Sequence, residues 1–255
     1  MRRLFVDKPD KILKIIGDDH KHLSLVLRSK VGEHVVVSCD DEGFGANCFD
    51  ITYVIKSISK NETILEYLTS THNLTEPSIK LTLFSAILKG DKNEAVVKMC
   101  TELGVKEIVP FTSEFVSAHK DSYKQERIQK IMLEAAKQSG RGYVPKVRTV
   151  VSFNAMCDMA SRFDLVLFLY EGETVNDAQT FLRSKFSGCS VGNSPQIKNI
   201  AMIVGSEGGF SKKEVGALVN KGVVPVTIGR RILRAETACV VAVSLVLYEA
   251  GQMKQ

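Results

Sequence analysis

The sequence lacks the features that mark membrane and secreted proteins. No apolar run reaches the about 18–20 residues that span a bilayer, and the longest candidate covers only residues 238–247. Residues 1–10 contain Arg2 and Arg3 and then three further charges where a signal peptide needs an apolar segment. We therefore expect a cytoplasmic protein with no membrane partner.

A cysteine pattern is also missing. The six cysteines form no CxxC pair, and no histidine stands near one at the spacing of a zinc site. Free thiols in a reducing compartment are predicted, rather than disulfides or a bound metal. These residues are Cys39, Cys48, Cys100, Cys157, Cys189 and Cys239.

The phosphate-binding loops of common nucleotide enzymes are absent. The chain has neither the GxGxxG fingerprint of dinucleotide-binding folds nor a Walker loop. Its glycine-rich segments come late, at residues 205–209 and 229, whereas a Rossmann loop follows the first strand. These absences argue against NAD, FAD and nucleoside triphosphates as cofactors.

Positive charge, by contrast, is gathered in three stretches. The net charge is +5, with eight Lys/Arg against five Asp/Glu in residues 1–38, eight against three in 119–148, and six against one in 211–234. Residues 39–72 hold two against six. Such blocks fit a footprint for the phosphate backbone of nucleic acid, although solvated helix faces give the same pattern.

The first seventy residues are rich in β-formers. Runs at 35–38, 48–58 and 63–68 are separated by turn signals, and a helix is predicted over 17–27. Several short strands in this length predict a small barrel. The polar stretch 70–78 reads as a linker.

From residue 79 onward, strands and helices alternate, which predicts an α/β fold with a parallel sheet. Helices are expected where caps and apolar periodicity coincide, with Asp91 and Gly104 bounding one helix and a capping box from Ser211 to Glu214 opening another. Residues 184–198 are expected to form a surface loop. The predicted strands cover 81–88, 107–111, 164–170, 199–204 and 223–228, and the helices 91–103, 123–139, 212–220 and 236–249.

Three predicted strands end in loops suited to a ligand. Parallel sheets bind ligands beyond the carboxyl ends of their strands, and here those ends lead into residues 170–173, 205–211 and 229–238. Glycine at such an end lets a ligand approach the backbone. Residues 205–209 alone could equally be a tight turn, but a charged pair at Arg234 and Glu236 beside an apolar helix favours a functional site.

These segments resemble the SPOUT methyltransferases, and within them the RsmE family, which methylates uracil N3 in small-subunit (16S) ribosomal RNA. The resemblance rests on residues 204–210 and 228–238 and continues in 89–94, 101–105, 126–127 and 134–141. Ser206 stands where the family usually has proline, Ile128 where it often has tryptophan, and Asn93 where it has a large apolar residue.

The resemblance implies a trefoil knot in a SPOUT methyltransferase domain over 73–255 and a PUA-like RNA-binding barrel over 1–72. It also implies S-adenosyl-L-methionine as cofactor, ribosomal RNA as partner, and a homodimer. The expected cofactor pocket comprises Leu169, Tyr170, Glu171, Val204, Gly205, Gly208, Gly209, Ile228, Gly229, Ile232, Leu233, Thr237 and Ala238.

Three charged residues are the expected catalytic groups. Arg234 can stabilise negative charge on uracil, and Glu236 and Glu207 are candidate bases. Structural roles remain open for each, including a salt bridge between Arg234 and either carboxylate. No metal is expected. The candidate RNA contacts are Arg2, Arg3, Arg28, Lys89, Lys92, Glu94, Glu134, Gln138 and Arg141.

Two alternative functions remain. A SPOUT ribose 2′-O-methyltransferase would keep the cofactor loops but not the motifs at 89–94 and 134–141. A non-catalytic RNA-binding protein on the same scaffold would have little use for intact loops at 205–210 and 229–238.

Overall fold

A computed structural model describes residues 3–39, 48–118, 123–187 and 197–254. The chain divides into two compact units. The N-terminal unit comprises Met1–Glu76 together with Ala136–Val144, and the C-terminal unit comprises Pro77–Ala135 and Pro145–Gln255. A segment well beyond the predicted linker thus packs with the N-terminal unit.

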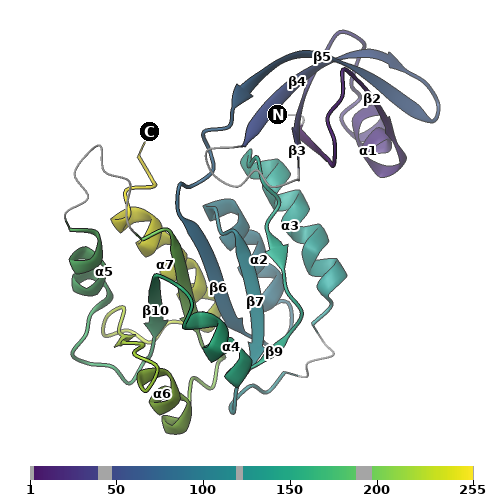
Figure 1. The fold of residues 1–255 in the computed structure, drawn as a ribbon. Helices are drawn as coiled ribbons and strands as arrows, with labels where there is room; N and C mark the ends of the chain where they lie inside the picture. Colours follow the sequence, from purple (N-terminus) through teal and green to yellow (C-terminus); the bar gives the residue numbers. More distant parts are fainter. Residues whose placement is uncertain (1–2, 40–47, 119–122, 188–196, 255) are drawn as a thin grey trace. The chain divides into compact units, whose positions relative to one another are not determined.

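The N-terminal unit is a curled five-stranded sheet with one helical segment (Figure 1). Its strands are β1 (Arg3–Val6), β2 (Ile12–Ile16), β3 (His34–Cys39), β4 (Phe49–Ile58) and β5 (Glu62–His72), in the order β1-β3-β4-β5-β2. The β1–β3 pair is parallel and the others are antiparallel. Leu23, Val35, Tyr53, Ile55 and Leu65 are among the residues of its core.

The predicted helix over 17–27 is present, but it changes type halfway. It begins as α1 (Gly17–Lys21) and continues as the π-helix His22–Val26. Arg28 follows in the left-handed region, with φ 47°. The sequence prediction missed β1 and β2, and β5 extends to His72 into the stretch predicted to be a linker.

The C-terminal unit contains a parallel seven-stranded sheet, as predicted. Its order is β12-β10-β11-β6-β7-β8, with β9 also pairing with β7. The strands are β6 (Lys80–Ala86), β7 (Glu107–Thr112), β8 (Lys146–Val147), β9 (Val151–Ser152), β10 (Leu165–Leu169), β11 (Asn199–Val204) and β12 (Pro225–Val226). Because β10, β11 and β12 are adjacent, the loops that follow them meet at one edge of the sheet.

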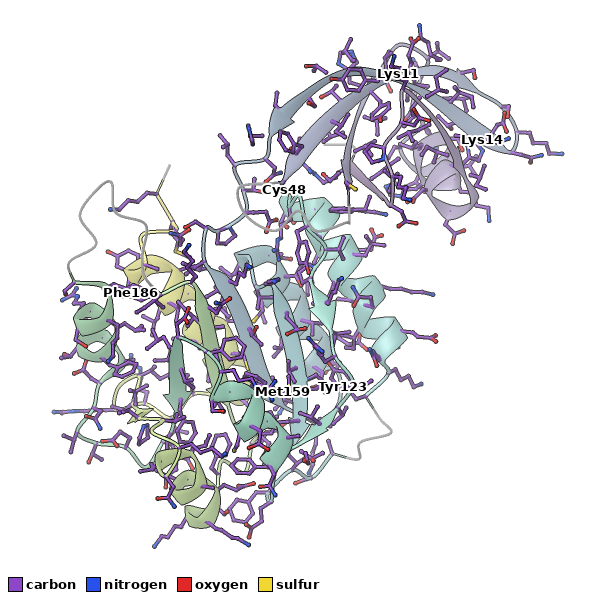
Figure 2. All side chains as sticks on the ribbon, viewed as in Figure 1. Lys11, Lys14, Cys48, Tyr123, Met159 and Phe186 are labelled. Atoms are coloured by element: carbon purple, nitrogen blue, oxygen red, sulfur yellow. The ribbon has the colours of Figure 1, made fainter. Side chains whose placement is uncertain are left out.

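Helices cover both faces of this sheet. Alternating strand residues feed two separate cores, so that Leu83 and Met202 face α2, α3, α5 and α7, while Phe84 and Ile203 face α4 and α6. Figure 2 labels Phe186, which belongs to the first core, and Met159, which packs against the second. The helices are α2 (Lys92–Leu103), α3 (Gln125–Ser139), α4 (Phe153–Ala160), α5 (Ala178–Phe186), α6 (Lys212–Val219) and α7 (Ala235–Glu249).

Helix ends follow the predicted chemistry at two of three places. Gly104 closes α2 with φ 108°, and Ser211 and Glu214 form the capping box of α6. Asp91 precedes α2, but its side chain makes no capping bond. The Asn93 amide instead bonds the backbone of Leu88, accepting from its N–H and donating to its carbonyl.

Several elements differ from the sequence prediction, and β8 and β9 were not predicted. β12 is only two residues long, α4 was missed, and α5 occupies residues 184–186 of the expected surface loop. Residues 188–196 of that loop lie outside the described part of the chain. No helix within the described ranges is long and apolar enough to cross a bilayer.

Candidate cofactor and RNA site

A cavity of about 780 Å³ opens at the carboxyl ends of β10, β11 and β12. The three loops predicted from the sequence form its walls. Among the expected cofactor residues, Gly208 and Thr237 are not part of its lining. Those that line it are Leu169, Tyr170, Glu171, Val204, Gly205, Gly209, Ile228, Gly229, Ile232, Leu233 and Ala238.

The loop after β10 is fixed by one carboxylate. Oε1 of Glu173 accepts hydrogen bonds from the backbone N–H groups of Thr174, Val175 and Asn176 at 3.0, 2.7 and 3.0 Å. These bonds hold the pKa of Glu173 below its usual value. Asn176 in turn accepts a backbone bond from Thr227, so the first and third loops are joined. Glu173 and Thr174 line the cavity and were not predicted.

The glycine loop after β11 is shaped by its protein neighbours. A Cβ at Gly205 would lie 2.8 Å from the Phe210 ring, and one at Gly208 would lie 2.7 Å from Cβ of Phe115. Gly209 has φ +68° and donates its N–H to the Ser206 carbonyl at 2.9 Å. Internal packing therefore requires glycine at two of these positions, and Gly205 and Gly209 also line the cavity, as the sequence predicted.

The loop after β12 provides the open part of the cradle. Gly229 has φ +115°, and a Cβ there would meet nothing within 4 Å. Arg230, Arg231 and Ile232 follow, all exposed and all lining the cavity. The two arginines were not predicted as site residues, although they belong to the basic block 211–234.

Four charged side chains gather beside the cavity. Nζ of Lys92 contacts Oε1 of Glu207 at 2.7 Å, and the Lys89 N–H approaches the same oxygen at 3.4 Å. The hydrogen bond from Lys92 to Glu207 raises the pKa of Lys92. The charge of Glu236 raises this pKa further, and the charge of Arg234 opposes the increase. The structure thus brings all three predicted catalytic residues together with a predicted RNA contact.

The two candidate bases differ in their surroundings. Burial alone would raise the pKa of Glu207, but hydrogen bonds from Lys92 and backbone N–H groups outweigh it and lower the pKa. Oε2 of Glu236, in the first turn of α7, is buried and has no hydrogen-bond partner among the described residues. Glu207 thus already accepts several hydrogen bonds, whereas Oε2 of Glu236 accepts none from the described residues.

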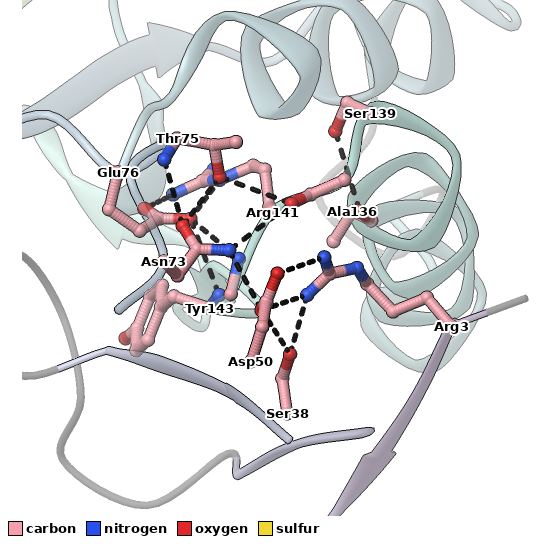
Figure 3. Close-up of polar contacts among 12 residues, drawn as sticks. Arg3, Ser38, Asp50, Asn73, Thr75, Glu76, Ala136, Ser139, Arg141 and Tyr143 are labelled. Carbon is pink, nitrogen blue, oxygen red and sulfur yellow. Dashed lines mark hydrogen bonds and ion pairs between the residues drawn. The ribbon is translucent and has the colours of Figure 1, made fainter. Parts of the chain in front are cut away.

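Two predicted RNA contacts lie in the interior of the N-terminal unit (Figure 3). Arg3 is 5% exposed and makes a double hydrogen bond to Asp50 at 2.6 and 2.7 Å. Arg141 is 2% exposed and bonds Glu76 at 3.0 and 2.7 Å. Their placement does not support direct RNA contact, because both guanidinium groups are engaged with buried partners.

The other predicted RNA contacts are more accessible. Arg28, Lys89, Glu134 and Gln138 are exposed, whereas Arg2 lies outside the described residues. Glu94 is partly buried and forms an ion pair with Arg127 at 2.7 Å.

The described residues contain no cluster of metal-binding side chains. Five cysteines are free thiols, and the sixth, Cys189, falls outside the described ranges. Burial raises the pKa of Cys239, three residues after Glu236 on α7, to about 12, which makes it a poor nucleophile.

Known proteins share this architecture. A family model for RNA methyltransferase domains matches residues 75–247. A Bacillus subtilis protein named ribosomal RNA small subunit methyltransferase E is 31% identical over 264 residues, covering 100% of this chain and 99% of its own. A Rickettsia conorii protein of the same name is 29% identical over 238 residues, covering 92% of this chain and 88% of its own.

A solved structure agrees with these relatives. The ribosomal RNA small subunit methyltransferase E of Neisseria gonorrhoeae, bound to S-adenosyl methionine, superposes with a TM-score of 0.80 at 25% identity and covers 97% of both chains. The family resemblance read from the motifs is therefore confirmed. Because the family model spans more than half of the chain and the Bacillus subtilis relative aligns along nearly all of both proteins, this chain belongs to the RNA methyltransferase family of the ribosomal RNA small subunit methyltransferase E proteins.

Proposed function

We propose that this protein is an S-adenosylmethionine-dependent methyltransferase that modifies uracil N3 in small-subunit (16S) ribosomal RNA. The observation that carries the proposal is the cavity at three adjacent strand ends, in a chain that matches a ribosomal RNA methyltransferase along its whole length. The family name supports the RNA substrate, and the charged group beside the cavity supports chemistry on an ionisable base.

The cavity suits S-adenosylmethionine in size and lining. Its volume of about 780 Å³ lies within the roughly 300–1,000 Å³ typical of sites for small ligands. Val204, Leu233 and Ala238 offer apolar surface, the strand ends offer backbone donors and acceptors, and Glu171 and Glu173 offer negative charge near a cationic ligand. When bound there, the cofactor supplies an electrophilic methyl group.

The protein's task is then to prepare uracil N3, which carries a proton at neutral pH. We assign the removal of this proton to Glu236, whose buried Oε2 has no hydrogen-bond donor among the described residues. Arg234, exposed at the cavity wall, is assigned to stabilise the negative charge that develops on the uracil oxygens. Glu207 holds Lys92 at the rim, so its assigned role is positioning rather than proton transfer.

Further expectations belong to the same proposal. The segment 1–72 is proposed to be a PUA-like RNA-binding barrel, and its curled sheet supports this. The segment 73–255 is proposed to carry a trefoil knot. A homodimer is supported by α7, which is mostly apolar and yet leaves Tyr248 66% exposed. Cytoplasmic location is consistent with a ribosomal RNA substrate.

RNA contacts remain proposed for the accessible candidates, Arg28, Lys89, Lys92, Glu134 and Gln138. Arg28 has the strongest local support. It is exposed and held in the left-handed region after a π-helix, and both features are uncommon and concentrate at functional sites.

Mass spectrometry of digested ribosomal RNA tests the reaction. RNA from cells lacking the protein should lose one 3-methyluridine, and adding the purified protein with S-adenosylmethionine should restore it. The appearance of a 2′-O-methyl mark instead would support the ribose methyltransferase. If calorimetry detects no S-adenosylmethionine binding, the enzyme proposal fails altogether.

A further inference from the structure

Phe115 is an exposed aromatic side chain next to the glycine loop that borders the cavity, although it does not itself line the cavity. It lies in the turn after β7, where the Val116 N–H bonds the Ser113 carbonyl at 3.2 Å. Val116 packs against the second core of the C-terminal unit, while Phe115 remains 45% exposed. Phe115 makes no ring contact with another aromatic residue of the described chain.

The backbone of this turn is attached to the glycine loop and to the first turn of α6. Oγ of Ser206 donates to the Phe115 carbonyl at 3.3 Å. A Cβ at Gly208 would come within 2.9 Å of that carbonyl oxygen, so only glycine lets the two segments approach. The Glu114 N–H bonds Oε1 of Glu214, whose other oxygen accepts from the Ser211 N–H.

The location of the Phe115 ring next to the glycine loop points to a role in RNA binding. Gly208 stands between Glu207 and Gly209, which both line the cavity. An exposed phenyl ring on a hydrogen-bonded turn can offer a face for stacking, and single-stranded RNA is commonly held by bases stacking on aromatic faces. Arg231, exposed at the same cavity, provides positive charge of the kind that a phosphate backbone needs.

We propose that Phe115 is a stacking platform for an unpaired base of the RNA, and so positions the strand next to the methyl donor. The inference rests on the proposed function and adds a residue to it. Phe115 is a positioning residue, because its ring takes no part in proton or methyl transfer.

The absence of tryptophan from the chain permits a direct test. The Phe115→Trp variant would carry a single indole at the proposed platform, and Val219→Trp would carry one at the last residue of α6, which is 47% exposed and does not line the cavity. With S-adenosylhomocysteine present, we expect saturable quenching of the Phe115→Trp emission by an oligouridylate single strand. A fully paired RNA duplex should not quench it, and Val219→Trp should respond to neither.

Affinity measurements complete the test. Phe115→Ala retains the Cβ and backbone atoms that contact the glycine loop, so calorimetric affinity for S-adenosylmethionine should not change. Affinity for the oligouridylate should fall by about five- to hundred-fold, the usual effect of losing one base–aromatic stack, and Phe115→Trp should restore it.

Three results would overturn the inference. Unchanged oligouridylate affinity in Phe115→Ala would remove the stacking role. Equal loss of cofactor affinity would make the ring part of the pocket. Emission that responds to protein dilution but not to RNA would place the ring against a second copy of the chain. If wild-type protein bound no S-adenosylmethionine, the proposed function would fail instead, whatever the oligouridylate results.

Discussion

The buried pair of Arg141 and Glu76 offers the sharpest test of the N-terminal unit. The two side chains are 2% and 0% exposed. Glu76 accepts two bonds from the guanidinium and two more from the N–H groups of Gly142 and Tyr143, at 3.1 and 3.3 Å. Glu76→Gln keeps the shape and one acceptor oxygen but leaves a buried positive charge without its counter-ion.

The expected cost follows from this burial. Removing one partner of a fully buried ion pair costs about 3–5 kcal/mol, whereas exposed pairs contribute about 1 kcal/mol or less. The Lys221–Asp158 pair, with side chains 40% and 66% exposed, is the matched control. A loss of about 3–5 kcal/mol in Glu76→Gln corresponds to an increase of roughly 10²- to 10⁴-fold in the equilibrium constant for local opening.

Hydrogen exchange of the Gly142 and Tyr143 amides measures this opening. In Glu76→Gln, the exchange of these two amides should accelerate by roughly 10²- to 10⁴-fold. In Asp158→Asn, the exchange rate of the same amides should not change. Glu76→Leu combined with Arg141→Met should recover much of the protection, because an apolar pair needs no counter-ion. If exchange in Glu76→Gln stayed within threefold of wild type, Arg141 would be free for another role, and RNA contact would again be the better reading.

Three further predictions concern the catalytic group and acid stability. Arg234→Ala should slow methyl transfer by about 10²- to 10³-fold, with little change in calorimetric cofactor affinity. The neighbouring variant Arg230→Ala should retain most of the activity. An equal loss of cofactor affinity in Arg234→Ala would instead make Arg234 a pocket residue. Lys92→Met and Glu207→Gln should each slow methyl transfer by about tenfold, and the double variant no further, since the two form one pair; additive losses would show independent roles. Burial would raise the pKa of Asp50, but hydrogen bonds led by the one from Arg3 hold it below 3.8. Its stabilising contribution is therefore complete above pH 3.8 and is lost as pH falls through the lower folded-state pKa. Acid titration followed by circular dichroism should show Asp50→Asn without this acid-side loss.

Local sequence chemistry predicted the regular elements where one signal dominated. The buried strand at 199–204, the capping box at Ser211 and the glycine end of α2 were all confirmed. β12 fell short because only two of its apolar residues find a partner in β10. β1 and β2 were missed because short edge strands beside charged residues carry little periodic signal.

The site, like the fold, was predicted where local sequence was sufficient and missed where it was not. The rule that parallel strands bind ligands at their carboxyl ends was sufficient to find the loops, since it needs only strand positions. Sequence could not place Arg3 and Arg141, because a basic residue looks the same whether it faces solvent or a buried carboxylate. Asp50 and Glu76 are far from these arginines along the chain, and folding alone makes them partners.

The sequence by itself determined which segments form the cavity, since glycine, charge and apolar runs at 204–210 and 228–238 are local properties. Only the tertiary structure decided how the charges divide their work. It pairs Glu207 with Lys92, buries Oε2 of Glu236 with no donor among the described residues, and sets the Phe115 turn against Gly208. Such differences arise from distance and desolvation between residues remote in sequence, which exist only once the chain is folded.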